Sequence, residues 1–434
     1  MTETLPVAII GAGPIGLAAA AQLIRRGETP LVLEAGDAVG HSMRQWGHVA
    51  MFSPWSFNTD KAAVALLREA GWVHPPPEAI PTGGELVARY LEPLAALPAL
   101  RGRIRFGARV AAVTRAGFDK VRTQSRFAQP FLLRVADDAG GETNIPARAV
   151  IDASGTWNAP NPAGADGLPA LGERDAAARI FYGIPDVLGV QRRRYAGRSV
   201  AVVGGGHSAL NALIELATLK DEVPATRIQW IMRKDTIASV YGGEAADALP
   251  ARGALGSAAR LLVESGAVRV LSPFRVSRIE RSADGGLTIV GGEADATADE
   301  LIVATGFRPD LAMLREIRLT LDPWLESSGT LGPLIDPNLH SCGTVRPHGA
   351  AELAHAEPGF FIVGMKSYGR APTFLLATGH EQARSVVAAL TGDAAGAVRV
   401  ELALPKSGVC NGPPPRRDIS RIPVAATACC GTRA

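Results

Sequence analysis

Two glycine-rich turns, about 190 residues apart, constrain the fold of this 434-residue chain more than any other feature. The first is GAGPIG at 11–16, which follows the short apolar run VAII at 7–10 and opens an Ala-rich segment of helical character. A second apolar run, PLVLEAG at 30–36, comes next and contains an acidic residue near its end. The pattern predicts a strand, a tight turn, a helix and a second parallel strand, which together form a βαβ unit.

The second glycine-rich turn, GGGHSA at 204–209, has the same surroundings. It lies within RSVAVVGGGHSALNALIELATL at 198–219, and the strand IQWIMRK at 228–234 follows it. Two βαβ units of this kind in one chain predict an α/β fold with two Rossmann-like dinucleotide-binding domains.

Each glycine of the first turn has its own physical role. Gly11 permits the tight turn, Gly13 lets the backbone approach a pyrophosphate at the helix N-terminus, and Gly16 allows close packing of the helix on the strand. Glu34, 18 residues after Gly16, would accept hydrogen bonds from ribose hydroxyl groups. This context favours a nucleotide site over the alternative, a tight turn without a ligand.

The second turn and the strand after it differ from the first in a useful way. Ala209 replaces the third glycine, as the motif allows. Arg233 and Lys234 stand where an NAD site would carry an acidic residue. A charge-assisted contact with a 2′-phosphate is worth about 1.5–3 kcal/mol, so we expect NADPH in preference to NADH. A solvated basic strand end is the alternative.

Two nucleotide sites in one chain imply hydride transfer between two bound cofactors. The simplest assignment is FAD in the first domain and NADPH in the second. Such a transfer needs alignment more than it needs an acid or a base. Pro372 and Thr373 stand at a predicted helix start, where backbone N–H groups would stabilise reduced anionic flavin. Ordinary helix capping is the alternative.

Three later segments indicate how the domains are arranged. AVIDASGTW at 149–157 and ELIVATGFRP at 300–309 each look like the strand that closes a nucleotide-binding domain, and 358–390 reads as a strand, a glycine-rich turn and a helix that return to the first domain. From Pro405 the composition shifts to Pro, Gly, Arg and Cys, which is typical of a tail. The expected parts are a discontinuous FAD domain at 1–165 and 325–404, an inserted NADPH domain at 170–320 and a flexible tail at 405–434.

The GAGPIG turn with Glu34, the GGGHSA turn with Arg233, and the segments IDASGTW and VATGFRP together resemble the two-dinucleotide-domain flavoproteins over residues 1 to about 400. Within that group the sequence is most similar to flavin-containing monooxygenases and their N-hydroxylating relatives. The resemblance implies FAD on the first domain, NADPH on the second, and a reduced flavin that activates O₂.

Differences from related flavoprotein families help to decide between a disulfide reductase and a monooxygenase. Pyridine nucleotide–disulfide reductases carry a redox cysteine pair near one nucleotide domain, whereas this chain has no cysteine before Cys342. Those enzymes also usually carry Gly-Asp after the late strand, where this chain has Gly364 and Met365. Both differences favour the monooxygenase-like branch. The monooxygenase signature FxGxxxHxxx is degraded, however, because the matching segment at 179–189 contains no histidine.

The segment SMRQWGHVAMFSPWSFNTD at 42–60 is dense in aromatic residues for a chain that is only 5% aromatic. In related flavoproteins the segment after the ribose-binding acid runs beneath the flavin. The resemblance therefore makes Arg44, Trp46 and Ser53 candidate catalytic residues that contact flavin or substrate. Core packing of the aromatic side chains in this segment is the alternative.

The remaining expected cofactor contacts follow from the two turns, the 42–60 segment and the later strand ends. In the first domain they are Gly11, Gly13, Pro14, Ile15, Gly16, Glu34, Ala35, His41, Arg44, Trp46, Val110, Ser154, Gly155, Gly364, Met365, Thr373 and Phe374. In the second domain they are Gly204, Gly206, His207, Ser208, Ala209, Arg233, Lys234, Ala304, Thr305 and Gly306. The spacing of His41, His48 and His207 suggests no metal site.

Three of the four cysteines, Cys410, Cys429 and Cys430, lie on the predicted tail. Adjacent cysteines form strained disulfides, but thiolates together can hold a soft metal or metalloid. The adjacent pair resembles the thiol-delivery tail of mercuric reductase. The segments SCGTVRPHG at 341–349 and VGMKSYGRAPTF at 363–374 resemble flavin monooxygenases of arsenic-resistance operons. The hypothesis is that these thiols capture a trivalent (methyl)arsenical and present it to the flavin. A disordered tail with incidental thiols is the alternative.

Composition excludes several other classes of protein. The net charge of +3 is spread along the chain without a basic block, which argues against a nucleic-acid partner. The N-terminus lacks a basic n-region, no apolar run is long enough to span a bilayer, and four cysteines do not make a secreted disulfide framework. We therefore expect a soluble cytoplasmic protein without a membrane partner. A homodimer remains open.

The sequence as a whole predicts an FAD- and NADPH-dependent monooxygenase-like oxidoreductase that uses O₂ to oxidise a small molecule with a soft heteroatom. One alternative is a thiol/disulfide or metalloid reductase that uses the C-terminal cysteines. A second alternative is a non-catalytic metalloid-binding or redox-sensing flavoprotein.

Overall fold

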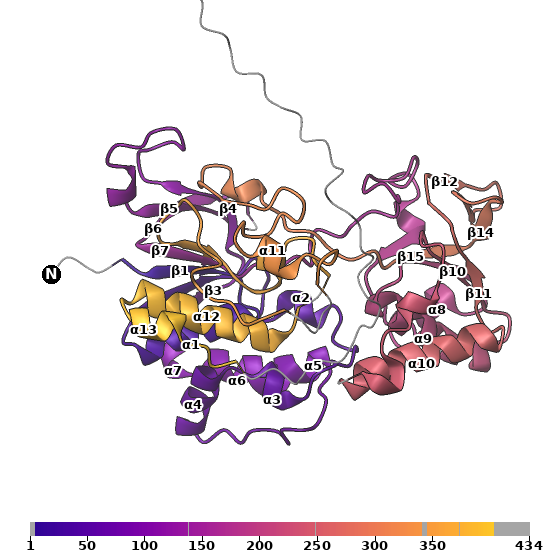
Figure 1. Cartoon of the computed structure of the whole chain (residues 1–434), viewed down its shortest axis with the longest axis horizontal. Coiled ribbons are helices and arrows are strands. Elements are labelled where there is room, and N and C mark those ends of the chain that lie inside the picture. The colour runs from indigo at the N-terminus through magenta and orange to yellow at the C-terminus, as the bar shows by residue number, and fades with distance from the viewer. Residues whose placement is uncertain (1–4, 138, 248, 341–344, 373, 403–434) are drawn as a thin grey trace, which may run out of the picture.

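The computed structural model describes residues 5–402 except 138, 248, 341–344 and 373. Its first lobe is built on a parallel sheet whose strand order is β16-β7-β1-β2-β3. These strands are β1 Val7–Ile10, β2 Pro30–Leu33, β3 Ile104–Arg105, β7 Ala149–Asp152 and β16 Phe360–Ile362. Because β16 pairs with β7, the chain returns to this sheet after building the second lobe, and Figure 1 shows the indigo and yellow ends of the described chain together.

Helices α1 (Pro14–Arg25) and α12 (Leu376–Leu390) pack against each other beside this sheet. The Ala-rich sequence of α1 buries every residue from Ile15 to Leu23. Alanine has the highest helix propensity and a small side chain, so this helix can lie close to its neighbours. Tight packing of α1 fixes the position of the glycine-rich turn that precedes it.

An antiparallel sheet covers the other face of the first sheet. It consists of β4 Arg109–Arg115, β5 Phe131–Ala136 and β6 Glu142–Ala147, in that order. Side chains of β5 alternate between buried and exposed, which is the period expected of a strand with one solvated face. Its buried Phe131 and Leu133 share a core with Ile10 of the parallel sheet.

The second lobe has a parallel sheet with the order β11-β10-β9-β15-β8. The strands are β8 Ile180–Tyr182, β9 Ser199–Val203, β10 Arg227–Ile231, β11 Arg269–Leu271 and β15 Glu300–Val303. One face packs on α9 (His207–Glu222) and α10 (Pro250–Glu264), and the other on an antiparallel sheet of β12 Arg278–Arg281, β13 Leu287–Val290 and β14 Ala296–Ala298. Figure 1 shows these elements gathered in one lobe.

Short helices occupy the connections. They are α2 His41–Arg44, α3 Trp55–Asn58, α4 Lys61–Glu69, α5 Gly83–Leu86, a π-helix at Val87–Leu91, α6 Glu92–Ala96, α7 Pro98–Arg101, α8 Arg192–Tyr195, α11 Gly332–Ile335 and α13 Ala394–Val398. Single 3₁₀ turns are found at Arg126–Ala128, Ala177–Arg179, Ala238–Val240, Glu244–Ala246, Ala312–Leu314 and Gly364–Tyr368. No helix among the described residues is both long and apolar enough to cross a membrane.

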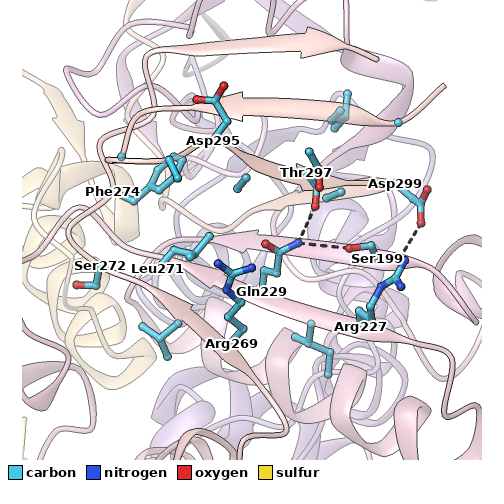
Figure 2. Close-up of a pocket in the computed structure, with 18 of the residues that line it drawn as sticks. Ser199, Arg227, Gln229, Arg269, Leu271, Ser272, Phe274, Asp295, Thr297 and Asp299 are labelled. Atoms are coloured by element: carbon cyan, nitrogen blue, oxygen red, sulfur yellow. Dashed lines mark hydrogen bonds between the residues drawn. The ribbon is translucent and has the colours of Figure 1, made fainter. Parts of the chain in front are cut away.

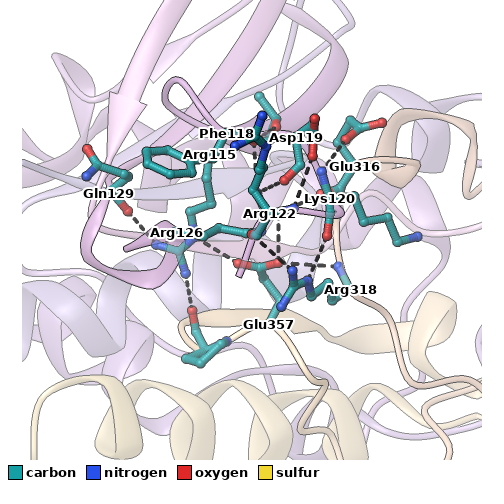
Figure 3. Close-up of polar contacts among 12 residues, drawn as sticks. Arg115, Phe118, Asp119, Lys120, Arg122, Arg126, Gln129, Glu316, Arg318 and Glu357 are labelled. Atoms are coloured by element: carbon teal, nitrogen blue, oxygen red, sulfur yellow. Dashed lines mark hydrogen bonds and ion pairs between the residues drawn. The ribbon is translucent and has the colours of Figure 1, made fainter. Parts of the chain in front are cut away.

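A buried carboxylate holds the antiparallel sheet of the first lobe in place (Figure 3). Glu357, just before β16, pairs with Arg115 of β4 at 2.8 Å and with Arg126 at 2.9 Å, and all three side chains are almost fully buried. The backbone N–H of Arg318 also donates to Glu357. These contacts fix three segments, which are far apart in the sequence, against one another.

The two parallel sheets confirm the predicted α/β class, and the observed elements follow the predicted order. The VAII run forms β1, the turn GAGPIG opens α1, and PLVL forms β2. The GGGHSA turn lies between β9 and α9 in the same way.

Candidate functional site

A cavity of about 570 Å³ opens where the carboxyl ends of the first sheet's strands meet the second lobe. Ile10, Leu33 and Gly364, which end or follow β1, β2 and β16, are among its lining residues. Ligands of open α/β sheets bind at this edge. The volume lies within the range of about 300–1,000 Å³ that ligand pockets occupy.

The first glycine-rich turn shapes one wall of this cavity. Gly11 has φ +100°, a left-handed conformation that favours glycine, and a Cβ on Gly16 would lie 1.9 Å from the carbonyl oxygen of Gly11. A Cβ on Gly13 would meet no atom within 4 Å, and no side chain caps the N-terminus of α1. Free backbone N–H groups and open space at a helix N-terminus are what a phosphate group needs.

Glu34 lies beside this turn at the end of β2. Its carboxylate oxygens accept hydrogen bonds from the backbone N–H groups of Ala12 at 2.7 Å and Gly36 at 2.8 Å. These two bonds hold the side chain on the rim of the cavity, which Glu34 lines. Each oxygen has a second lone pair for a hydroxyl donor, so the arrangement fits a ribose.

The second glycine-rich turn faces the same cavity. Gly204 has φ +136°, and a Cβ there would lie 2.3 Å from the carbonyl oxygen of Ala304. A Cβ on Gly206, the N-cap of α9, would meet no atom within 4 Å. His207 and Ser208, which begin α9, line the cavity, so both turns open onto one space.

Arg233 and Lys234, just after β10, are exposed and face solvent. The guanidinium of Arg233 donates to the carbonyl of Ala165 at 3.3 Å, and the ammonium of Lys234 donates to the hydroxyl of Ser239 at 3.3 Å. Neither cation has a carboxylate partner in the part of the chain that the structure describes. Both charges are therefore available to a phosphate.

The three candidate catalytic residues differ in their surroundings. Trp46 and Ser53 line the cavity, and the Ser53 hydroxyl donates to the side-chain oxygen of buried Asn58 at 2.8 Å. Arg44 does not line it, because its guanidinium pairs with Glu92 at 2.6 Å and donates to a backbone carbonyl. The geometry thus brings Trp46 and Ser53, but not Arg44, to the space where a reaction would occur.

The other predicted contacts divide in the same way. Those that line the cavity are Gly11, Gly13, Pro14, Ile15, Glu34, Ala35, His41, Val110, Ser154, Gly155, Gly364, Met365, Phe374, His207 and Ser208. Those that do not are Gly16, Gly204, Gly206, Ala209, Arg233, Lys234, Ala304, Thr305 and Gly306. Thr373, Cys342, Cys410, Cys429 and Cys430 lie outside the described residues.

Sequence reasoning missed a buried ion pair at the cavity wall. The ammonium of Lys366 lies 2.8 Å from a carboxylate oxygen of Asp152 and 3.1 Å from the hydroxyl of Ser154. Lys366 and Ser154 line the cavity, and the lysine is only 2% exposed. A lysine within the otherwise apolar run after β16 was the available signal.

Two aromatic side chains, also missed, join the lobes at the cavity. Trp157 of the first lobe stacks on Phe307 of the second, with ring centroids 4.8 Å apart. The indole N–H of Trp157 donates to the side chain of Gln45 at 2.8 Å. Both rings line the cavity, so its shape depends on the relative position of the two lobes.

A second hollow, of about 870 Å³, lies in the second lobe (Figure 2). It is lined by Ser199, Arg227 and Arg269, which begin β9, β10 and β11, and by residues of the antiparallel sheet. Gln229 crosses it and donates to the carbonyl of Thr297 at 2.7 Å. No residue of either glycine-rich turn lines this hollow, and it lies at the amino ends of the strands, opposite to where nucleotides bind.

Comparisons with known proteins agree with this architecture. Residues 8–130 match the sequence profile of the pyridine nucleotide-disulphide oxidoreductase family. No curated protein matches the sequence. The fold is similar to that of a bacillithiol disulfide reductase from Bacillus cereus, with a TM-score of 0.66 and 19% identity over 90% of this chain and 100% of the other.

A monooxygenase and an N-hydroxylase share the same fold. One is the cadaverine monooxygenase of Erwinia amylovora bound to FAD, with a TM-score of 0.63 and 14% identity over 93% of this chain and 97% of the other. The second is the ornithine N-hydroxylase of Kutzneria sp. 744 with reduced FAD and NADP⁺, with a TM-score of 0.59 and 17% identity over 90% and 99% of the two chains. At these identities the likeness shows a common fold.

Proposed function

We propose that this chain is an FAD- and NADPH-dependent oxidoreductase of the monooxygenase type. The observation that carries the proposal is that both glycine-rich turns open onto one cavity, which His207 and Gly13 line from different lobes. Two separate nucleotide sites would not need a shared space, whereas hydride transfer between two cofactors does. The FAD in the structure of the cadaverine monooxygenase, and the FAD and NADP⁺ in that of the ornithine N-hydroxylase, support the same assignment.

The first lobe would hold FAD. Free N–H groups at the start of α1, beside Gly13, would bind the pyrophosphate, and Glu34 would bind the ribose. When bound, FAD supplies hydride acceptance and reaction with O₂. Trp46 and Ser53 form part of the wall and position the substrate, while the paired charges of Lys366 and Asp152 leave that part of the wall neutral.

The second lobe would hold NADPH. The start of α9 at Gly206 would bind its pyrophosphate, and Arg233 and Lys234 would bind its 2′-phosphate. Since neither cation has a competing carboxylate among the described residues, both can be used for this selection. His207 and Ser208, which line the cavity, would hold the nicotinamide end there.

A monooxygenase is favoured over a disulfide reductase because no cysteine precedes Cys342 and none is among the described residues that line the cavity. For the substrate we infer a trivalent methylarsenical, held by Cys410, Cys429 and Cys430 in a three-thiolate set. The structure does not describe these residues. The inference about the substrate comes from the positions of these cysteines together with the resemblance to flavin monooxygenases of arsenic-resistance operons.

The test is to measure NADPH and O₂ consumption by the purified flavoprotein with methylarsenite, arsenite, amines and thioethers. Methylarsenite should stimulate both rates equally. A Cys429→Ser/Cys430→Ser variant should lose that stimulation and keep its FAD. Equal stimulation of wild type and variant would refute the capture role of the thiols.

A thiol or disulfide reductase is the second candidate, favoured by the family profile and by the likeness to the bacillithiol disulfide reductase. NADPH oxidation that depends on a disulfide and proceeds without O₂ uptake would support it. The same oxygen electrode experiment therefore separates the two candidates.

A further inference from the structure

Three side chains with metal-binding atoms meet where the two lobes touch. His48 lies between α2 and α3 of the first lobe, Asp186 lies between β8 and α8 of the second, and Glu215 lies in α9. One atom from each lies within 4.8 Å of the other two. The imidazole Nε2 of His48 is 3.9 Å from the carboxylate Oε1 of Glu215.

The surrounding contacts orient these atoms without satisfying them. Both oxygens of Asp186 accept backbone N–H groups, from Gly189 at 2.9 Å and Val190 at 3.1 Å. The Oε2 of Glu215 accepts the N–H of Val187 at 3.1 Å, while its other oxygen is the one near His48. The Nε2 of His48 is buried and has no hydrogen-bond partner in the described part of the protein.

This arrangement is costly when no cation is present. Burial raises the pKa of Glu215 to about 7, and the nearby charge of Asp186 adds to the effect. Burial also lowers the pKa of His48, so its imidazole is neutral near pH 7 and keeps a lone pair for a metal. A divalent cation would relieve the repulsion between the carboxylates and use the unpartnered nitrogen.

We propose that His48, Asp186 and Glu215 bind one divalent transition-metal ion, for which Zn²⁺ is the best fit. One imidazole nitrogen and two carboxylate oxygens are ordinary zinc ligands, and a water would complete a four-coordinate site. Bonds of about 2.0–2.2 Å require the donor atoms to lie within about 4 Å of one another. His48 and Glu215 meet this condition at 3.9 Å, and the ligand atom of Asp186 lies within 4.8 Å of both, so metal binding would draw Asp186 closer to them.

An ion at this position would connect the two lobes. Val49, next to His48, lines the cavity onto which both glycine-rich turns open, and α9, which carries Glu215, begins with His207, which lines the same cavity. A metal bridge between these segments would therefore hold α9, with the glycine-rich turn that precedes it, against the cavity-lining segment of the first lobe. The site is independent of the proposed function, since it uses none of the residues assigned to FAD, NADPH or substrate.

The experiment measures Zn²⁺ binding to the full chain by competition with a chromophoric chelator, after alkylation of the four cysteine thiols to remove their own affinity for zinc. The variants are His48→Ala and Glu215→Gln. The second is isosteric and can still accept the N–H of Val187, so it should fold even if the first does not. His74→Ala is the control, because His74 pairs with a hydroxyl and a carbonyl and belongs to no potential metal-binding cluster among the described residues.

We expect the alkylated wild type and His74→Ala to bind one equivalent of Zn²⁺. Each ligand variant should bind it more than about tenfold more weakly while keeping its far-UV circular dichroism and its flavin. Zinc should also raise the thermal midpoint of wild type and not that of Glu215→Gln. Failure of the alkylated wild type to bind Zn²⁺, or unchanged affinity in Glu215→Gln, would overturn the proposal and leave the flavin assignment untouched.

Discussion

Two glycines of the first turn, Gly13 and Gly16, have different surroundings. A Cβ at Gly16 would overlap the carbonyl of Gly11, so the protein itself excludes a larger residue. A Cβ at Gly13 would meet no protein atom within 4 Å, so nothing in the fold excludes it. In the proposed FAD site, a glycine at position 13 lets the pyrophosphate approach the backbone closely.

Gly13→Ala should therefore fold like wild type and lose FAD. The added methyl group would stand between the phosphate and the free N–H groups, which costs one or more charge-assisted hydrogen bonds and more than about tenfold in affinity. Flavin per chain after gel filtration measures the effect. Gly102→Ala is the matched control, because it also has open space around its Cα and a negative φ of −90°. Full FAD occupancy in Gly13→Ala would contradict the assignment.

The preference for NADPH should depend on Arg233 and Lys234. Replacing both by Ala removes two exposed cations without breaking any ion pair among the described residues. We expect the KM for NADPH to rise by about tenfold or more, while the KM for NADH stays unchanged. Steady-state rates with both nucleotides measure this. A loss that is equal for NADPH and NADH would show that the cations do not bind the 2′-phosphate.

Sequence reasoning at this scale succeeded where local spacing defines the geometry and failed where distant residues meet. The two turns could be placed because strand, turn and helix are adjacent in sequence. The surroundings of Arg44 and Lys366 could not be predicted. Arg44 pairs with Glu92, 48 positions away, and Lys366 pairs with Asp152, 214 positions away. Charged residues reveal their role only when their partners are known.

Among the elements, α4 shows how a helix cap can carry an electrostatic cost. Asp60 is the N-cap of α4, and its carboxylate accepts hydrogen bonds from the N–H of Ala63 and the amide of Gln22. The side chain is almost completely buried, and this burial raises its pKa to about 6. An Asp in the unfolded chain has a pKa of about 3.9. The contribution of Asp60 to the free energy of unfolding is therefore fully present below pH 4 and is lost as the pH rises to 6.

Asp60→Asn should remove this pH dependence, since Asn caps helices as well as Asp and carries no charge. The free energy of unfolding of the variant, relative to wild type, should increase by about 2–3 kcal/mol between pH 4 and pH 8. Urea denaturation at both pH values measures it. A difference between the two proteins that is the same at pH 4 and pH 8 would mean that Asp60 is ionised in the folded protein at no cost.

The Glu357 cluster makes a second prediction about elements. Glu357→Gln leaves the buried guanidinium groups of Arg115 and Arg126 without a counter-charge, which should cost about 3–5 kcal/mol of stability. Glu69→Gln is the control, because its pair with Arg25 is exposed and contributes about 1 kcal/mol or less. Urea midpoints compare the two variants. Equal, small effects would show that the buried cluster adds nothing to the antiparallel sheet's attachment.

Regular elements were predictable because buried parallel strands and Ala-rich helices have simple patterns. The predicted strands at 7–10 and 30–36 are observed at Val7–Ile10 and Pro30–Leu33. The 42–60 segment was expected as a flavin-side segment, and it forms α2, α3 and connecting turns. Of its aromatic residues, Trp46 and Phe52 line the cavity while Trp55 is buried in the core, a division that depends on tertiary packing.

At the scale of the whole molecule, the α/β class followed from two repeated βαβ units, but the shared cavity did not. That both turns open onto one space depends on how the lobes dock, through contacts such as Trp157 on Phe307 and the His48 cluster. Docking surfaces of this kind have no local sequence pattern. The histidine spacing likewise gave no sign of the proposed metal site, because Asp186 and Glu215 come from another lobe.

The central claim is that this docking lets NADPH reduce FAD within one cavity. The most direct test mixes the FAD-loaded full chain with NADPH in the absence of O₂ and follows the absorbance of oxidised flavin by stopped flow. We predict that one equivalent of NADPH bleaches all of the bound flavin and that admitted O₂ restores the colour. A protein that binds both FAD and NADPH while its flavin stays oxidised would contradict the claim.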